Sequence, residues 1–190
     1  TSSENIDLIR SVQKDCAWEA LAIIDAAGLS TYDSGAQKRV AERDYFQEGM
    51  QGKRTLSDPL ESRLDGKRRV ILGVPIYHDS EVIGVLGGSY DVGAMSHMLF
   101  EDIYNGKGYA FIVTKEGVVV SGDESQDYEK IPSTDNFFEY YENITFLDNI
   151  TIEDIREDFR AQRTGHLELN NGGSDRYLTY APLLLNGWML

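Results

Sequence analysis

Cysteine, histidine and long apolar runs are all scarce in this sequence. Cys16 is the single cysteine among 190 residues, so no internal disulfide can form and cysteine usage does not indicate a redox compartment. The three histidines, His78, His97 and His166, are scattered, and none stands at metal-ligand spacing from another ligand residue on an expected helix. No apolar run approaches the ~18 residues of a spanning helix, and no signal-peptide pattern opens the chain. We therefore expect no metal, no cofactor and no membrane span within these residues.

Positive charge is also in short supply. Lys and Arg number 18 against 32 Asp and Glu, which gives a net charge of -14 at pH 7. Such an acidic chain is a poor partner for nucleic acid and for anionic membrane surfaces. Neither a phosphate-binding loop nor a nucleophile elbow is present, because the glycine-rich residues 84–88 fall inside an expected strand. The sequence therefore does not predict an enzyme.

What the sequence does contain is a strong hairpin pattern at residues 68–92. Two runs rich in Val, Ile and Leu flank a polar turn at 78–81, which is typical of two antiparallel strands. A turn centred on Ser80 places three pairs of residues opposite one another on one face. The pairs are Gly73 with Gly87, Ile71 with Ser89, and Pro75 with Val85. The other face carries larger apolar side chains and is expected to be the core surface: Val70, Leu72, Val74, Ile76, Leu86 and Tyr90.

The paired glycines in the middle of this hairpin need a reason. Interior glycines weaken a strand, and their usual meaning is the close approach of another group. At Gly73 and Gly87 that group is either a ligand or a packed helix, and the hairpin pattern alone does not choose between them.

Further elements are expected on both sides of the hairpin. They are a helix over 3–16 capped by Ser3, strands over 21–25 and 29–32, a segment of helical character over 35–52, a polar connection over 53–65 and a helix over 93–104. In the first helix, one buried face is expected to hold Ile6, Ile9, Val12 and Cys16.

From residue 106 the pattern of the first half starts again. The strand, turn and glycine at 111–117 match those at 22–28, and the apolar residues with Pro and Gly at 181–190 match 74–86. Two matches in the same order predict an α+β fold with two tandem copies of one module, each an antiparallel sheet flanked by helices. A hairpin over 167–180, turned by 170–173, belongs to the second copy.

A charged and aromatic cluster at residues 42–46 precedes the hairpin. Arg43 stands beside Tyr45 and Phe46, so its guanidinium can clamp a carboxylate in bidentate fashion while the rings wall the rest of a ligand. The alternative is a surface arginine paired with Glu42 or Asp44, which the spacing alone favours.

The order of these motifs resembles the double Cache sensor domain over nearly the whole chain. The motifs are IIDAAG at 23–28, ERDYFQEGMQG at 42–52, the strands at 73–77 and 82–91, KGYAFIVTKEG at 107–117 and YAPLLLNGWML at 180–190. The resemblance implies an N-terminal helix followed by two PAS-like modules. It makes residues 1–19 a membrane-side helix, 20–104 the membrane-distal ligand-binding module and 105–190 the membrane-proximal module.

The same resemblance implies a place at the cell membrane. In that family the first helix comes from one transmembrane segment and the last strand leads into another. Both ends of this sequence look cut, so we read it as an excised extracytoplasmic segment of a microbial receptor. Diguanylate cyclase, histidine kinase and chemoreceptor outputs all fit, and pairing of the N-terminal helix with its twin would give a homodimer.

Ligand contacts follow from the resemblance residue by residue. The family's Arg-x-aromatic-aromatic motif falls on residues 43–46. Its amino-acid-binding subset has an acidic residue on the second hairpin strand, where this sequence has Ser89 with Asp91 next on the same face, and a tyrosine upstream, which is replaced by Lys38 or a neighbour. The expected ligand-binding residues are Lys38, Arg43, Tyr45, Phe46, Ile71, Gly73, Gly87, Ser89 and Asp91.

These observations predict a non-catalytic sensor that binds a small molecule in its N-terminal module. A buried ligand ammonium needs a carboxylate, whereas Ser89 supplies one neutral hydroxyl. We therefore expect a small carboxylate or another polar metabolite to bind more tightly than an α-amino acid. The alternatives are a sensor-like module without a small ligand, acting in dimerisation or protein contact, and a soluble enzyme.

Overall fold

The computed structural model describes residues 2–16, 18–92, 94, 110–122, 136–147, 149–171, 174–183 and 186–190. The chain divides into two compact units, Thr1–Ala94 and Met95–Leu190. The fold is α+β, and each described sheet lies within one unit. The expected module boundary at residues 104–105 lies outside the described residues, as does almost all of the expected helix over 93–104.

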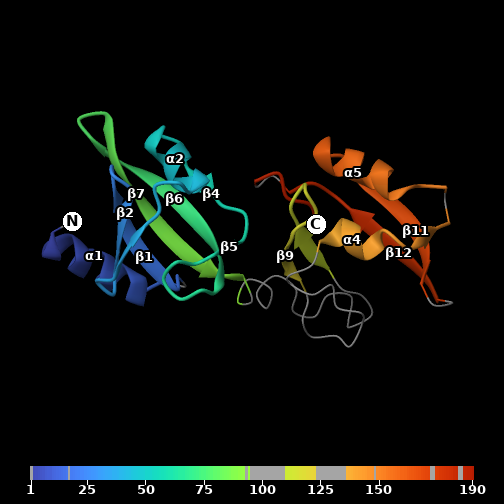
Figure 1. Ribbon diagram of the computed structural model, residues 1–190, viewed down its shortest axis with the longest axis horizontal. Coiled ribbons are helices and arrows are strands. Elements are labelled where there is room, and N and C mark those ends of the chain that lie inside the picture. Colours follow the sequence, from blue (N-terminus) through green and yellow to red (C-terminus); the bar gives the residue numbers. More distant parts are fainter. Residues whose placement is uncertain are drawn as a thin grey trace. The chain divides into compact units, whose positions relative to one another are not determined.

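The first unit is built on a seven-stranded antiparallel sheet (Figure 1). Its strands are β1 (Ala20–Asp25), β2 (Leu29–Tyr32), β3 (Gln37–Arg39), β4 (Thr55–Leu56), β5 (Leu60–Glu61), β6 (Arg68–His78) and β7 (Glu81–Asp91), with helices α1 (Ser3–Lys14) and α2 (Asp44–Met50). The strand order is β3-β2-β1-β7-β6-β4, and β5 also pairs with β6. This order puts β1 beside the long β6–β7 hairpin at the centre of the sheet.

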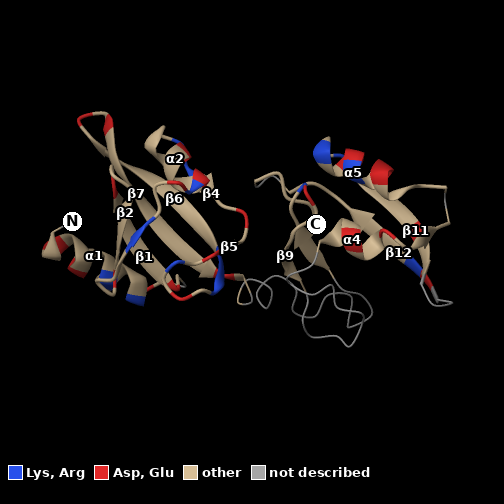
Figure 2. Cartoon of the chain, viewed as in Figure 1, with Lys and Arg blue, Asp and Glu red and all other residues tan. Residues whose placement is uncertain are grey.

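The β6–β7 hairpin has the strand pairing expected from the sequence. All three expected pairs form: Gly73 with Gly87, Ile71 with Ser89, and Pro75 with Val85. Asp79 and Ser80 form the turn with φ angles of 47° and 73°, which a two-residue type I′ turn requires. The register shifts by one residue after Ile76, and this bulge reconciles the two-residue turn with the pairing of the central strands. Acidic residues colour this turn red in Figure 2.

The buried core of the first unit lies on the face that carries Gly73 and Val85. Helix α2 contacts β6 and β7 there, and its Tyr45 and Phe46 join a buried cluster with Ile24, Val40 and Val85. The opposite hairpin face, expected to be the core surface, is only partly buried. Among the expected residues Val70 is buried and the others are half-buried. The hairpin pattern could not show the difference, because both faces are apolar and the cover that α2 gives to one of them is not part of the pattern.

Helix α1 packs against β1, and Trp18 follows it onto the opposite face of the sheet. The Trp18 ring lies where a Gly88 side chain would be, 2.9 Å from the position of a Cβ. The helix is capped by Ser2, whose Oγ accepts a hydrogen bond from the Asn5 backbone N–H, one residue before the expected cap. Ile9 is buried as expected, but Val12 is 50% exposed, so the expected apolar face of α1 is only partly covered.

The segment between residues 35 and 65 contains more strand than its sequence suggested. The expected helical segment over 35–52 is helix only in α2, and its first part forms the edge strand β3. The polar connection over 53–65 holds the short strands β4 and β5. Strands of two or three residues are too short to show an alternating pattern in the sequence. They form because β3 pairs with β2, and β4 and β5 pair with β6.

The second unit has two described sheets. Its elements are β8 (Phe111–Val113), β9 (Val119–Gly122), α4 (Phe137–Tyr141), β10 (Thr145–Phe146), α5 (Ile152–Arg160), β11 (Gly165–Asn171) and β12 (Ser174–Tyr180). Strands β10, β11 and β12 form one sheet, and β8 and β9 form the other. The expected hairpin over 167–180 is the β11–β12 pair, and Met189 bridges to Val113 and to Pro182.

Aromatic side chains dominate the core of the second unit. Phe137, Phe138, Tyr141, Phe159 and Tyr180 are all buried there, with ring centroids as close as 4.7 Å between Phe137 and Tyr141. The aromatic residues of the second unit named here are therefore core residues. In the described part of the chain, no helix is long and apolar enough to cross a membrane.

Candidate functional site

The register of the first sheet brings small residues together across its two central strands. Ala22 of β1 lies opposite Gly87 of β7, and Ala20 lies opposite Ser89. Residues that lie directly opposite in an antiparallel pair project to the same face, which here is the face that α2 partly covers. We call Ala20, Ala22, Gly87 and Ser89 the small-residue floor. Figure 1 shows its two strands, β1 and β7, in the middle of the sheet.

Gly73 and Gly87, which are paired in the hairpin, have different surroundings. A Cβ on Gly73 would lie less than 3.0 Å from Thr55 Oγ1 and 3.3 Å from the Tyr45 carbonyl oxygen, so strand β4 and helix α2 occupy that space. A Cβ on Gly87 would meet its nearest neighbour, Ile24 Cδ1, at 3.4 Å, an ordinary van der Waals distance. Packing of the described residues therefore explains a glycine at Gly73 but does not require one at Gly87.

The two aromatic residues of α2 that were expected to contact a ligand belong to the core. Tyr45 is 8% and Phe46 5% exposed. The Thr55 hydroxyl donates a hydrogen bond to the Tyr45 carbonyl oxygen at 3.1 Å, which fixes α2 against β4. Burial raises the pKa of the Tyr45 phenol, and the nearby Tyr32 phenol raises it further while Arg43 opposes the rise. The Tyr45 side chain therefore reaches from the core toward Tyr32 and Arg43.

Arg43 lies at the N-terminal cap position of α2, with 27% of its side chain exposed. Its guanidinium donates to the Glu61 carbonyl oxygen at 3.2 Å, and its Nε lies 3.8 Å from the Glu42 carboxylate. Arg63 also pairs with Glu42 and donates to the Arg39 carbonyl oxygen. The alternative of a pair with Glu42 is thus partly right, but at 3.8 Å this contact is long, and N–H groups of the Arg43 guanidinium can still donate to a closer carboxylate.

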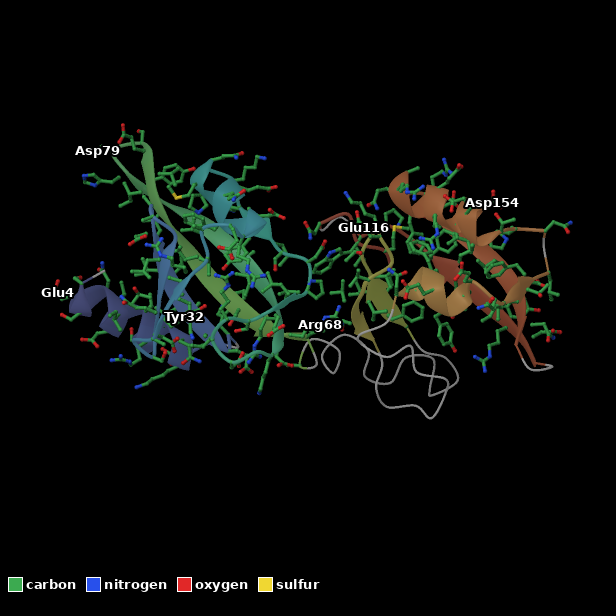
Figure 3. All side chains as sticks on the ribbon, viewed as in Figure 1. Glu4, Tyr32, Arg68, Asp79, Glu116 and Asp154 are labelled. Carbon is green, nitrogen blue, oxygen red and sulfur yellow. The ribbon has the colours of Figure 1, made fainter. Side chains whose placement is uncertain are left out.

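Sequence reasoning missed Tyr32 and Ser30. They share the floor's face, since Tyr32 lies opposite Ala22 and Ser30 opposite Ile24. Burial raises the pKa of Tyr32, while Ser30 and Arg43 oppose the rise (Figure 3 labels Tyr32 on β2). Ser30 is 1% exposed, and its hydroxyl has no partner of regular hydrogen-bond geometry in the described structure, although the Tyr32 phenol lies near. Alternation on a strand of four residues is too short a signal to single out either side chain.

The remaining predicted residues divide between the floor and its margins. The Ser89 hydroxyl donates to the Ala20 carbonyl oxygen at 3.3 Å. Ile71 is half-buried beside the α2 cluster. Lys38 is exposed on the edge strand β3, opposite Ser30, and lies one strand beyond the tyrosine on β2.

Asp91 is already occupied by an internal partner. Its carboxylate lies 2.7 Å from the Arg69 guanidinium, and it accepts a hydrogen bond from the Ala94 backbone N–H. Within the described residues no group of three or more His, Cys, Asp or Glu side chains could hold a metal ion. Apart from the carboxylates that pair with Arg69, the polar groups identified on this face are hydroxyls, phenols and guanidiniums, which suit an oxygen-rich or anionic ligand.

A family model decides which fold family this is. The model named dCache_1, described as "Cache domain", matches residues 3–190. The chain belongs to the Cache domain family. Cache domains are sensory rather than catalytic, so the expected resemblance and sensor class are confirmed. No curated protein matches the sequence.

Solved structures share this Cache fold at low sequence identity. The extracellular domain of mmHK1S-Z2, which is named as a histidine kinase, has a TM-score of 0.70 at 15% identity, covering 98% of this chain and 78% of that chain. The sensory domain of the Campylobacter jejuni chemoreceptor Tlp3 with isoleucine bound has a TM-score of 0.65 at 11% identity, covering 99% of this chain and 72% of that chain. At such identity the likeness concerns the fold and not the ligand.

Proposed function

We propose that this Cache domain is the extracytoplasmic ligand-sensing part of a transmembrane signalling receptor. The membrane-distal module, expected from the sequence at residues 20–104 and containing the sheet of the first unit, holds the ligand. The output domain, whether a histidine kinase, a diguanylate cyclase or a chemoreceptor, belongs to the rest of the receptor. The family and the chemoreceptor and histidine kinase neighbours support the sensor role.

The observation that carries the ligand site is the small-residue floor beside Arg43 and two phenols. Gly87 has room for a side chain that it lacks, which supports the ligand alternative for that glycine. Burial raises the pKa of both Tyr32 and Tyr45, and the nearby Arg43 guanidinium opposes the rise at each phenol, so the two phenols lie near Arg43. A carboxylate bound to Arg43 in bidentate fashion would lie next to the phenols, with the rest of the ligand on the floor.

The proposed ligand is a small carboxylate or another polar metabolite without a positive charge. The Tlp3 neighbours are described with isoleucine, L-norvaline and L-valine bound, and these ligands combine a carboxylate with an ammonium. Arg43 suits the carboxylate in either class of ligand. Ser89, however, offers one hydroxyl, and Asp91 is held by Arg69, so neither of the two positions expected to receive a ligand ammonium offers it an unoccupied carboxylate.

Signalling follows from a difference in affinity between two conformations. A ligand that contacts Arg43 on the helix side and the floor on the sheet side binds better when these parts are close together. Only such a difference can shift the population of conformations and so bias α1 and the chain that leaves β7. No chemical step on the ligand is needed.

Ligand screening with matched arginine variants tests this proposal. A panel of small carboxylates and the corresponding α-amino acids is screened by thermal shift, since a ligand at a hundred times its dissociation constant stabilises the fold by ~2.7 kcal/mol. We expect Arg43→Ala to weaken binding of the best carboxylate by at least tenfold, because a charge-assisted hydrogen bond contributes about 1.5–3 kcal/mol. Arg54→Ala, a change of equal charge at an exposed position, should leave binding unchanged. Equal binding by both variants would refute the role of Arg43.

A second function, dimerisation through α1, is favoured by one observation. Leu8 and Val12 are 62% and 50% exposed and stand four residues apart, so they form an apolar stripe on one side of the helix. A second copy of α1 could cover it. Sedimentation of a receptor with its membrane segments should show a dimer that Leu8→Lys weakens, whereas a strict monomer would contradict this function.

A further inference from the structure

Arg69 is a buried cation held by carboxylates from three separate segments. Its side chain is 5% exposed, and its guanidinium lies 2.7 Å from Asp91, 2.8 Å from Asp65 and 3.7 Å from Glu19. Asp91 ends β7, Asp65 belongs to the turn between β5 and β6, and Glu19 precedes β1. The two shortest distances are those of charge-assisted hydrogen bonds. Three acidic groups therefore converge on one cation-sized position. We call Arg69 with these three carboxylates the Arg69 cluster.

This position borders the proposed ligand site. Arg69 lies opposite Asp91, and Ile71 lies opposite Ser89. The Cα atom of Arg69 is therefore one pleat repeat, roughly 7 Å, from that of Ile71 beside the floor, and both side chains project to the same face. Asp65 is also close enough to Tyr32 to raise the pKa of that phenol. The carboxylates around Arg69 and the phenol beside Arg43 thus belong to one continuous stretch of the sheet face.

We propose that the Arg69 cluster is a cation-binding subsite that the chain fills from within, and that Arg69 thereby determines specificity against positively charged ligands. An ammonium that approaches Asp91 meets the positive charge of Arg69, which already neutralises this carboxylate at 2.7 Å. Drawing Asp91 away from Arg69 would leave the buried guanidinium with Asp65 as its remaining close partner, which is unfavourable. Without Arg69, the same carboxylates form a site for a small organic cation such as an alkylammonium or alkylguanidinium group.

The two parts of this inference depend differently on the proposed function. The existence of a cation subsite follows from the Arg69 cluster alone. Its effect on ligand choice rests on the proposed function, because it requires a ligand on the neighbouring floor. Separate experiments on the two parts distinguish failure of one from failure of the other.

Chemical rescue tests the cation subsite. Arg69→Ala should lower the thermal midpoint, and millimolar methylguanidinium should raise it again, with sodium chloride at equal ionic strength as the control. The wild-type chain should show no such rise, because its subsite is full. Asp91→Asn added to Arg69→Ala should weaken the methylguanidinium effect at least tenfold in concentration. If Arg69→Ala is unfolded, the same additive must restore its circular dichroism spectrum. Equal responses of wild type and variant, or none in either, would overturn the subsite.

Ligand choice is tested on a variant that keeps its hydrogen-bonding capacity. Arg69→Gln should shift the ratio of affinities for an α-amino acid over its deaminated carboxylate at least tenfold toward the amino acid, as measured by calorimetry. An unchanged ratio together with successful rescue would show a cation subsite that does not contact the ligand, and would overturn the specificity role. Absence of carboxylate binding in the wild type, with rescue intact, would instead refute the proposed function.

Discussion

Substituting Gly73 or Gly87 of the hairpin by alanine should have opposite effects on stability. Gly73→Ala places a methyl group against Thr55 Oγ1 at less than 3.0 Å and against the Tyr45 carbonyl oxygen at 3.3 Å. Gly87→Ala places it at 3.4 Å or more from every neighbour. Neither glycine has a positive φ, so alanine fits the backbone at both positions.

The expected magnitudes follow from these distances. Overpacking of a well-filled site costs about 1–3 kcal/mol, whereas removing a glycine's freedom in the unfolded chain contributes about 0.4–1 kcal/mol. Gly73→Ala should therefore lower the free energy of unfolding, by up to about 2.6 kcal/mol. Gly87→Ala should leave it unchanged or raise it by up to about 1 kcal/mol. Ligand binding should fall in Gly87→Ala, because the added methyl group occupies the floor.

Urea unfolding followed by segment-resolved hydrogen exchange measures both effects in the first unit. Exchange of the β6 and β7 peptides separates that unit from the second, which contains its own core. The matched pair controls for composition, since both variants add one methyl group to the same hairpin. Equal destabilisation by both alanines would refute the distinction drawn between the glycines. Full ligand affinity in a stable Gly87→Ala variant would remove the floor from the ligand site.

Three further predictions concern the ligand and the second unit. Ser89→Asp should shift ligand preference toward amines, as measured by calorimetry; an unchanged preference would contradict the position of Ser89 on the floor. Tyr180→Phe should destabilise the second unit by about 1–3 kcal/mol at pH 7, because it removes the 2.5 Å hydrogen bond that the phenol donates to Asp158. That hydrogen bond, with Arg163, holds the pKa of Asp158 below its ordinary 3.8, so the stabilisation from the hydrogen bond is present above pH 3.8 and is lost as the pH falls further. Urea midpoints at pH 7 and pH 3 should show that the stability difference between Tyr180→Phe and wild type shrinks at the lower pH. A constant difference would contradict this. Thr151→Ala should cost about 1 kcal/mol by removing the α5 capping box, and Thr151→Ser should restore most of it in the same assay.

The sequence predicted those features that local pattern determines. A polar turn between two apolar runs is enough to predict the register of β6 and β7, since the position and length of the turn determine which residues lie opposite one another. The strand–turn–glycine repeat likewise predicted turns that end at Gly28 and Gly117. Both glycines have a positive φ there. These features depend on residues that are near one another in the chain.

Features that depend on distant packing could not be predicted in this way. The covered face of the hairpin is set by α2, and the short strands β3, β4 and β5 exist because longer strands pair with them. The contribution of Tyr32 requires the β1–β2 register, which places it across from Ala22. The pairing of Asp91 with Arg69 agrees with the predicted register, which places the two residues directly opposite each other, but the further partners Asp65 and Glu19 come from outside the hairpin and could not be foreseen.

Hydrogen exchange with and without the best-binding carboxylate tests the central claim most directly. The account predicts slower exchange at the N-terminus of α2, in β6 and β7 around Ile71 and Gly87, and in β2 at Tyr32, all within the first unit. It predicts no change in β11 and β12 of the second unit, and no slowing in Arg43→Ala at the same ligand concentration. Protection confined to the second unit, or equal protection in Arg43→Ala, would contradict ligand binding at this site.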